Sequence, residues 1–139
     1  MSFVKYTVES DVGKKRVINE DRAAFFERSD NIKLAILADG MGGHNAGDVA
    51  SEMAVVQFEK YFKEADASIF YSEDTIKQWL KQSVSTLNYE MYQYSLMHDE
   101  CHGMGTTLIV AVITNNREIV VSHVGDSRVY TFTNDETLL

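Results

Sequence analysis

The residues best suited to chemistry lie in a short segment that combines one carboxylate with three glycines. Residues 38–44 (ADGMGGH) follow an apolar run, so the sequence predicts that Asp39 projects from the end of a buried strand into a cleft. Glycines let backbone carbonyl oxygens approach a ligand closely. Carboxylate and carbonyl oxygens are the ligands that Mg²⁺ and Mn²⁺ prefer. The segment therefore favours a divalent-cation site over a plain turn, the usual role of an isolated Asp-Gly pair.

A glycine-rich phosphate-binding loop is the competing interpretation of this segment. The spacing opposes it, because no Lys-Ser/Thr pair follows Gly47. In addition, Asn45 stands where the third glycine of a G-x-G-x-x-G loop belongs. We therefore prefer the cation site.

Further acidic residues could contribute to the same chemistry. Glu20 and Asp21 come just before a predicted strand, and Arg16 lies five residues before Asp21. An arginine is well suited to bind a phosphoryl dianion through bidentate hydrogen bonds. Asp126 adds a carboxylate at a tight turn, within residues 125–128 (GDSR). Taken singly, these motifs indicate only a surface loop with a weak charge pair and a hairpin turn.

The spacing of apolar residues predicts the elements that would position these side chains. Period-two or continuous apolar runs indicate strands, and apolar residues at helical spacing indicate helices, the second capped by Ser72. The order is three strands, two helices and three strands, which favours an α+β layered domain over a doubly wound parallel sheet. The predicted strands are 3–9, 22–27, 32–38, 106–113, 118–124 and 128–132, and the predicted helices are 46–64 and 72–97.

Composition limits the classes of partner and compartment. The chain has 139 residues, which suits one domain, and a net charge of −8 without any basic run, so nucleic acid is an unsuitable partner. Its single cysteine, Cys101, excludes an intrachain disulfide and favours a reducing compartment. We find neither a secretory signal nor an apolar run long enough to span a membrane. The sequence thus predicts a cytoplasmic protein.

Four motifs, taken together, resemble the bacterial branch of the type 2C metal-dependent serine/threonine protein phosphatases. They occur in the family's order, at plausible separations, and cover essentially the whole chain. The resemblance implies antiparallel sheets flanked by helices, in a layered αββα fold that is incomplete here. The motifs are residues 16–21 (R-x-x-x-E-D), 38–47 (A-D-G-M-G-G-H-x-A-G), 103–107 (G-M-G-T-T) and 124–128 (V-G-D-S-R).

The resemblance also implies a role for each matching metal-site residue. Asp39 would bridge two metal ions, and the Gly40 carbonyl would bind one of them. Glu20 and Asp21 would act largely through metal-bound waters, whereas Asp126 would serve an additional, weaker metal position. The implied cofactors are two or three Mn²⁺ or Mg²⁺ ions in a complete domain. Paired cations of this kind activate a bridging water for attack on phosphorus.

Substrates and the remaining catalytic groups follow from the same resemblance. Arg16 would hold the substrate phosphate, and the substrates would be phosphorylated proteins, including a serine/threonine kinase. Cys101 would take no part as a nucleophile, because its acidic neighbours raise the pKa of a thiol. Some family members carry a histidine at the position of Met41. His44 is not a direct substitute, so the acid that protonates the leaving group stays unassigned.

The family's later half supplies further aspartates that residues 1–139 do not include. We therefore expect this chain to be the N-terminal part of the domain. Asp39 and the Gly40 carbonyl alone are a poor cage for cations that need about six oxygen ligands. We expect this part alone to bind metal weakly, to hydrolyse phosphoesters poorly or not at all, and to self-associate through an open sheet edge.

Two rival interpretations remain open on the sequence alone. The first is a non-catalytic module that uses the same fold for protein interaction. The second is a zinc site, since His98 and His102 are four residues apart, as on one helical face, and Cys101 adds a soft ligand. Residues 99–103 resemble a helix end that breaks into a loop, which argues against the zinc site.

Overall fold

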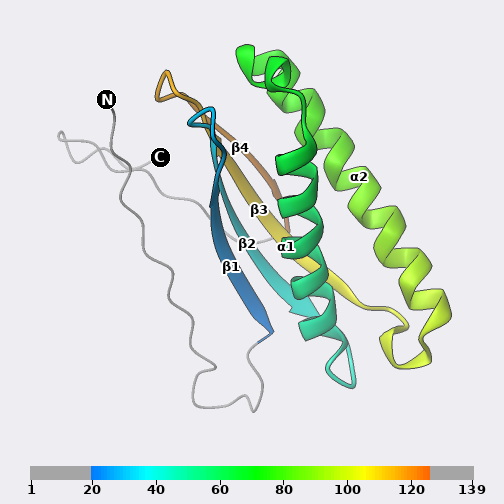
Figure 1. Ribbon diagram of the computed structural model, residues 1–139. Helices are drawn as coiled ribbons and strands as arrows, with labels where there is room; N and C mark the ends of the chain where they lie inside the picture. The colour runs from blue at the N-terminus through cyan, green and yellow to red at the C-terminus, as the bar shows by residue number, and fades with distance from the viewer. Residues whose placement is uncertain (1–19, 126–139) are drawn as a thin grey trace.

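A four-stranded antiparallel sheet and two long helices make up residues 20–125, the part of the protein that the computed structural model describes (Figure 1). The predicted strands 3–9 and 128–132 lie outside these described residues. The elements in chain order are β1 (Asp21–Glu27), β2 (Lys33–Met41), α1 (Ala46–Glu64), the 3₁₀ helix η1 (Ala67–Tyr71), α2 (Glu73–Met97), the 3₁₀ helix η2 (Asp99–Cys101), β3 (Gly105–Ile113) and β4 (Ile119–Val124).

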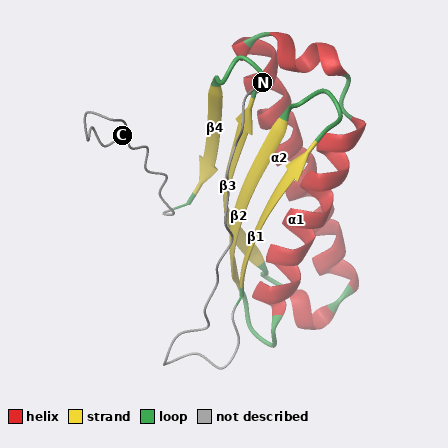
Figure 2. Cartoon of the chain, turned by 60° about the vertical axis from the view of Figure 1, so that its left-hand side comes forward, coloured by secondary structure: helices red, strands yellow, loops and turns green. Residues whose placement is uncertain are grey.

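The strands follow one another across the sheet in the order β1-β2-β3-β4. Every neighbouring pair is antiparallel, and β2 pairs with β3 although both helices lie between them in the sequence. Both α1 and α2 cover the same face of the sheet (Figure 2). This architecture confirms the predicted α+β class with antiparallel strands and adjacent helices.

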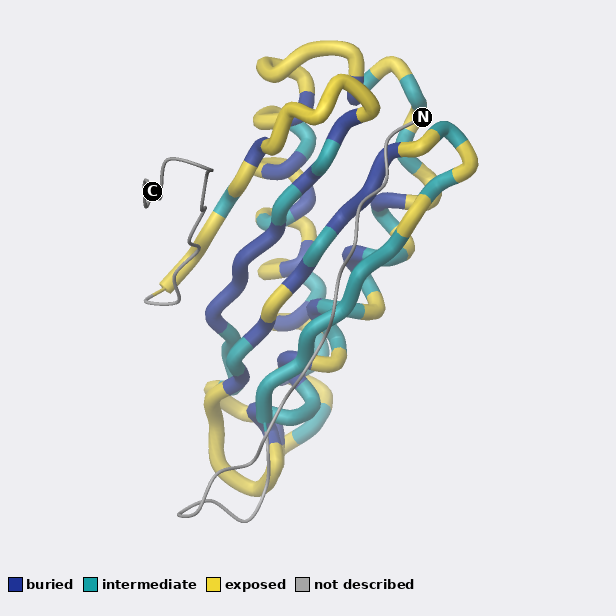
Figure 3. Tube along the Cα trace, turned by 90° about the vertical axis from the view of Figure 1, so that its left-hand side faces the viewer, coloured by how far each residue is buried: buried dark blue, intermediate teal, exposed yellow. Residues whose placement is uncertain are grey.

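Alternation along β2 separates a buried face of the sheet from an open one. Leu34, Ile36 and Ala38 are almost completely buried, because they point toward the helices. Leu37 lies on the other face and keeps 37% of its surface exposed. Figure 3 shows the same division, with buried positions concentrated where the sheet meets the helices. We call these the helix face and the open face of the sheet.

Aromatic side chains fill the space between the two helices at one end of the core. Phe58 and Phe62 of α1 and Phe70 of η1 all pack against Trp79 of α2, with ring centroids 5.5–6.4 Å apart. Two of the three pairs are edge-to-face, a favourable arrangement for aromatic rings. The rings fix the distance between the helices above the sheet.

The bounds of both helices agree with the prediction. The Ser72 side chain caps α2 by accepting a hydrogen bond from the Thr75 amide at 3.2 Å, as the sequence predicted. On the side of α2 that faces the core, Ser83 is buried, whereas its neighbour Val84 is only partly buried. Among the described residues no helix is long and apolar enough to cross a bilayer.

One predicted boundary is wrong, and it affects the candidate site. The sequence predicted that the strand 32–38 ends before Asp39, whereas β2 continues to Met41. The extension arises because Asp39, Gly40 and Met41 pair with residues 105–107 of β3. Partners on the next strand thus override the helix- and strand-breaking tendency of glycine. Asp39 is a residue of a paired strand, not of a loop.

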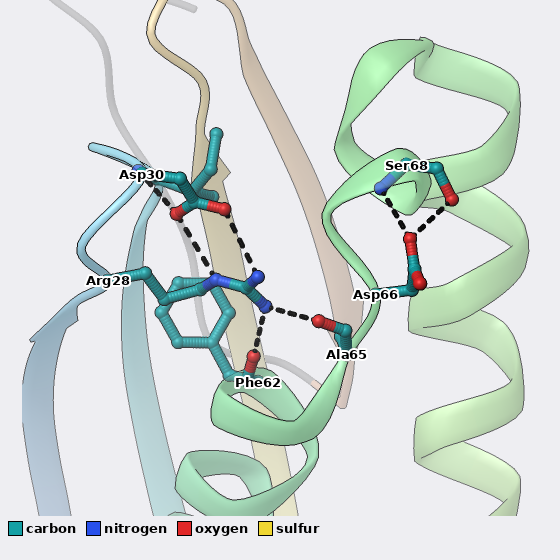
Figure 4. A network of polar contacts seen from close by, with 7 residues as sticks. Arg28, Asp30, Phe62, Ala65, Asp66 and Ser68 are labelled. Carbon is teal, nitrogen blue, oxygen red and sulfur yellow. Dashed lines mark hydrogen bonds and ion pairs between the residues drawn. The ribbon is translucent and has the colours of Figure 1, made fainter.

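Arg28 connects the β1–β2 turn to the C-terminal end of α1 (Figure 4). Its Nη1 donates hydrogen bonds to the carbonyl oxygens of Phe62 and Ala65, both at 2.7 Å. Its Nε and Nη2 donate to the Asp30 carboxylate at 3.2 and 3.1 Å. The guanidinium also lies 4.9 Å from the centre of the Phe70 ring. Carbonyls at a helix end have no partner within the helix, so Arg28 supplies one.

We predict that Arg28→Met lowers the free energy of unfolding by about 2–3 kcal/mol, because two helix-end carbonyls and the Asp30 carboxylate lose a charged donor. Urea unfolding followed by circular dichroism measures the change. Lys63→Met is the matched control, since it removes an exposed ion pair with Glu59 on the same helix and should cost far less. Equal losses in the two variants would contradict the assigned role of Arg28.

Candidate functional site

Asp21 and Asp39 lie directly opposite each other on β1 and β2. Residues paired in this way share one face of a sheet, with β-carbons about 4.5–5.5 Å apart. Because their neighbours Arg22 and Ala38 are on the helix face, the two carboxylates are on the open face. On the other side of Asp39 lies Thr107 of β3, whose hydroxyl is 3.5 Å from the Asp39 carbonyl oxygen. Both aspartates are half-buried.

Glu20 and Gly40 occupy the same end of the sheet, next to the start of α1. The Gly40 amide donates a hydrogen bond to the Glu20 carbonyl oxygen at 3.1 Å. A β-carbon built on Gly40 would overlap the carbonyl group of Gly47, the second residue of α1. A β-carbon on Gly47 would in turn overlap the Glu20 carboxylate. We call this meeting point of β1, β2 and α1 the glycine corner.

The loop from β2 to α1 has an unusual backbone. Gly42, His44 and Asn45 all have positive φ, at 145°, 52° and 67°. Such values suit glycine and asparagine, and they turn the chain sharply from the strand into the helix. Asn45 precedes α1 without a side-chain capping hydrogen bond, and the first turn carries the acidic Asp48. An acidic side chain is favourable there because the N-terminal end of a helix carries partial positive charge.

The structure brings together four of the six predicted site residues. Glu20 and Gly40 lie against α1, and Asp21 and Asp39 lie next to them on the open face of the same end of the sheet, whereas Arg16 and Asp126 lie outside the described residues. The donors at the corner are all oxygen atoms, three carboxylates and a backbone carbonyl, which fits a hard divalent cation. Within residues 20–125, no group of three or more His, Cys, Asp or Glu side chains is arranged to hold a metal ion. The corner therefore offers part of a cation site.

Sequence reasoning missed an ion pair beside this corner. Nη2 of Arg22, on the helix face of β1, contacts Oδ1 of Asp48 in the first turn of α1. A signal for it lay in the sequence, since a basic side chain on the helix side of a strand favours an acidic partner, and Asp48 in the first turn of α1 supplies one. Gly47 was also a signal, because glycine is costly inside a helix unless close packing demands it. Gly40 and Gly47 also serve the packing of β2 on α1, because neither position has room for a β-carbon.

The zinc alternative is not supported among the described residues. The ring of His98 stacks on Tyr94 with centroids 3.9 Å apart, and its Nδ1 lies 3.0 Å from the Tyr94 carbonyl oxygen. His98, Cys101 and His102 form no metal-binding group in this part of the chain. Burial raises the pKa of the Cys101 thiol, and Glu100 raises it further. The predicted direction is confirmed, although burial is the larger cause.

A groove of about 410 Å³ is lined by residues of α2 and β4 and by none of the described candidate site residues. It runs between α2 and β4, and its walls combine aliphatic side chains with the two lysines Lys77 and Lys81. Lys77 is already paired with Glu73 at 2.7 Å. No Asp, Glu, His or Cys side chain of the described residues lines this groove, so we place the candidate cation site at the glycine corner.

Known proteins resemble this chain in both sequence and fold. The chain is 43% identical over 125 residues to the serine/threonine phosphatase stp of Listeria monocytogenes, a match that covers 90% of this chain and 48% of that protein. The structure of the S. agalactiae serine/threonine phosphatase shares 38% identity and a TM-score of 0.80, covering 93% of this chain and 52% of that one. This chain therefore spans about half the length of the curated relatives it matches.

A second solved structure adds a metal to the comparison. The catalytic domain of the serine/threonine protein phosphatase PstP, in complex with 2 manganese ions, is 31% identical with a TM-score of 0.73. That match covers 94% of this chain and 52% of PstP's. Residues 13–139 match the family described as Protein phosphatase 2C. The chain accordingly belongs to the protein phosphatase 2C family.

Proposed function

We propose that the protein hydrolyses phosphoserine and phosphothreonine in other proteins, with divalent cations held at the glycine corner. One observation carries the proposal: Asp21 and Asp39 face each other on the open face of the sheet, next to Gly40, whose carbonyl oxygen is a further hard donor. Membership of the protein phosphatase 2C family and the manganese in PstP support it.

The residues of the glycine corner have different proposed roles in cation binding. The Asp39 carboxylate and the Gly40 carbonyl would ligate metal directly, while Glu20 and Asp21 would act largely through bound waters. A pair of divalent cations, when bound, lowers the pKa of a water and neutralises charge on the phosphoryl group. Arg16 would orient the substrate phosphate, and Asp126 would serve an additional metal position, as the family resemblance implies.

Several finer proposals accompany the phosphatase assignment. The cations are Mn²⁺ or Mg²⁺, and a serine/threonine kinase is among the phosphoprotein substrates. Residues 1–139 belong to a single domain in the cytoplasm. Self-association, where it occurs, uses an edge of the sheet, because a strand edge offers unpaired amide and carbonyl groups. In the described sheet the edge strands are β1 and β4.

Asp39→Asn tests the assignment directly. In the full-length gene product, it should lower kcat/KM for a phosphopeptide on the order of 100-fold or more, because a neutral amide is a poor ligand for a hard cation. Phosphate release at several Mn²⁺ concentrations measures the effect. Glu59→Gln, the corresponding change on the exposed side of α1, is the matched control. Unchanged turnover in Asp39→Asn would refute the proposal.

Gly40→Ala tests the dependence of the site on the close contact between β2 and α1. The added methyl group must displace the Gly47 carbonyl, so we expect weaker Mn²⁺ binding by about tenfold or more and lower stability. Gly43→Ala is the control, because a β-carbon there meets nothing within 4 Å. Calorimetric Mn²⁺ titration compares the two variants. If both bind Mn²⁺ like the unsubstituted protein, the corner does not determine the cation site.

We further propose that residues 1–139 alone turn over phosphopeptides weakly or not at all. The described part contains no group of three metal-binding side chains, and the chain covers about half of its relatives. A malachite-green assay with Mn²⁺ and a phosphopeptide measures the activity of this chain against that of the full-length gene product. Robust turnover by residues 1–139, abolished by Asp39→Ala, would show that the described donors suffice.

A further inference from the structure

The start of β1 and the first turn of α1 are joined by the ion pair between Arg22 and Asp48. Each partner is next to a residue of the glycine corner. Arg22 follows Asp21, and Asp48 follows Gly47, against which the Glu20 carboxylate and Gly40 both pack. The ion pair therefore lies on the helix face directly behind the carboxylates of the open face.

A second arginine of the same region holds the other end of α1. Arg28 binds the carbonyls of Phe62 and Ala65 at the helix C-terminus, whereas Arg22 contacts Asp48 near its N-terminus. The six steps from Arg22 to Arg28 span about 20 Å of extended chain, and the fourteen steps from Asp48 to Phe62 span about 21 Å of helix. The matching lengths let β1 and its turn hold α1 at both ends with the strand nearly parallel to the helix axis.

The two arginines differ in how much they can contribute to stability. The Arg28 side chain is 13% exposed and has four hydrogen bonds to protein groups. The side chains of Arg22 and Asp48 are 39% and 33% exposed, and ion pairs with such exposure add little to the free energy of folding. The Arg22–Asp48 pair thus contributes little to the free energy of folding. A small displacement of this part of β1 would, however, move the candidate metal donors Glu20 and Asp21.

Asp21 lies at the end of its strand, because Asp21 and Asp39 form the first pair of the β1–β2 ladder. Strand ends open more readily than strand centres. Arg22 is the residue that links this end to the helix layer.

We propose that Arg22 and Asp48 are positioning residues, which hold Glu20 and Asp21 at the distance from Asp39 and Gly40 that cation binding requires. The inference rests on the proposed function, since it concerns the same cation site. It assigns the pair no contact with metal or substrate. Groups that orient metal-binding side chains typically change metal affinity by about 10–100-fold when removed.

The test compares Arg22→Gln, Asp48→Asn and Arg28→Met in the full-length gene product. Calorimetry gives the Kd for Mn²⁺, thermal unfolding without metal gives the stability, and phosphopeptide turnover gives kcat at saturating Mn²⁺. We expect Arg22→Gln and Asp48→Asn each to raise the Kd for Mn²⁺ about tenfold with little change in melting temperature, and to recover most of kcat at high Mn²⁺. Arg28→Met should do the reverse, lowering the melting temperature while leaving the Kd within about twofold of the unsubstituted value.

Two further variants distinguish a role in positioning the metal donors from a general destabilisation of the fold. Arg22→Lys keeps the charge and should restore part of the Mn²⁺ affinity that Arg22→Gln loses. The double variant Arg22→Gln/Asp48→Asn should bind Mn²⁺ no more weakly than either single variant, because the two side chains act as one pair.

Three results would overturn the inference. The first is that Arg22→Gln leaves the Kd for Mn²⁺ unchanged while Asp39→Asn abolishes Mn²⁺ binding. This result would refute the role of Arg22 and leave the proposed function intact. Another is an equal rise of the Kd in Arg22→Gln and Arg28→Met, which indicates loosening of the whole fold. The third is unchanged Mn²⁺ affinity in Asp39→Asn itself, which removes the proposed function and the inference together.

Discussion

At Gly40 and Gly47, the backbones of β2 and α1 approach so closely that neither position has room for a β-carbon. This contact sets where α1 begins relative to the end of β2, and the Glu20 carboxylate packs against the same point. Asp39 precedes Gly40 on a strand that is paired on both sides, so its position is determined by β1 and β3 together. The geometry of the candidate site is thus a consequence of packing between the sheet and the helix.

The helix face of the sheet packs against α1, and the open face carries the candidate metal-binding carboxylates Asp21 and Asp39. Arg22, Ala38 and Gly40 point toward α1 and hold the layers together, whereas Asp21 and Asp39 point away from it. Because alternate residues of a strand face opposite ways, a stabilising residue and a candidate metal-binding residue are neighbours in the sequence at each of these places. A substitution on the helix face can therefore move a carboxylate on the open face without touching it.

Sequence patterns predicted the helices and the described strands, because apolar spacing is a local signal. Short motifs singled out Glu20, Asp21, Asp39 and Gly40, which the structure places at one end of the sheet. They did not predict that β2 extends through Asp39 to Met41, since this depends on pairing with residues 105–107, far away in the sequence. The packing role of Gly40 was also hidden, because Gly47 comes close to it only through the loop that reverses the chain. Contacts between layers, such as Arg22 with Asp48, require the fold to be known first.

Family membership and the arrangement of the corner lead to the same central claim, that divalent cations bind where β1, β2 and α1 meet. Anomalous diffraction from crystals of the full-length gene product grown with Mn²⁺ tests this most directly. The account predicts manganese peaks beside the Asp39 carboxylate and the Gly40 carbonyl oxygen. Peaks confined to other parts of the molecule, for example near His98 and His102, or no peak at the corner at saturating Mn²⁺, would contradict it.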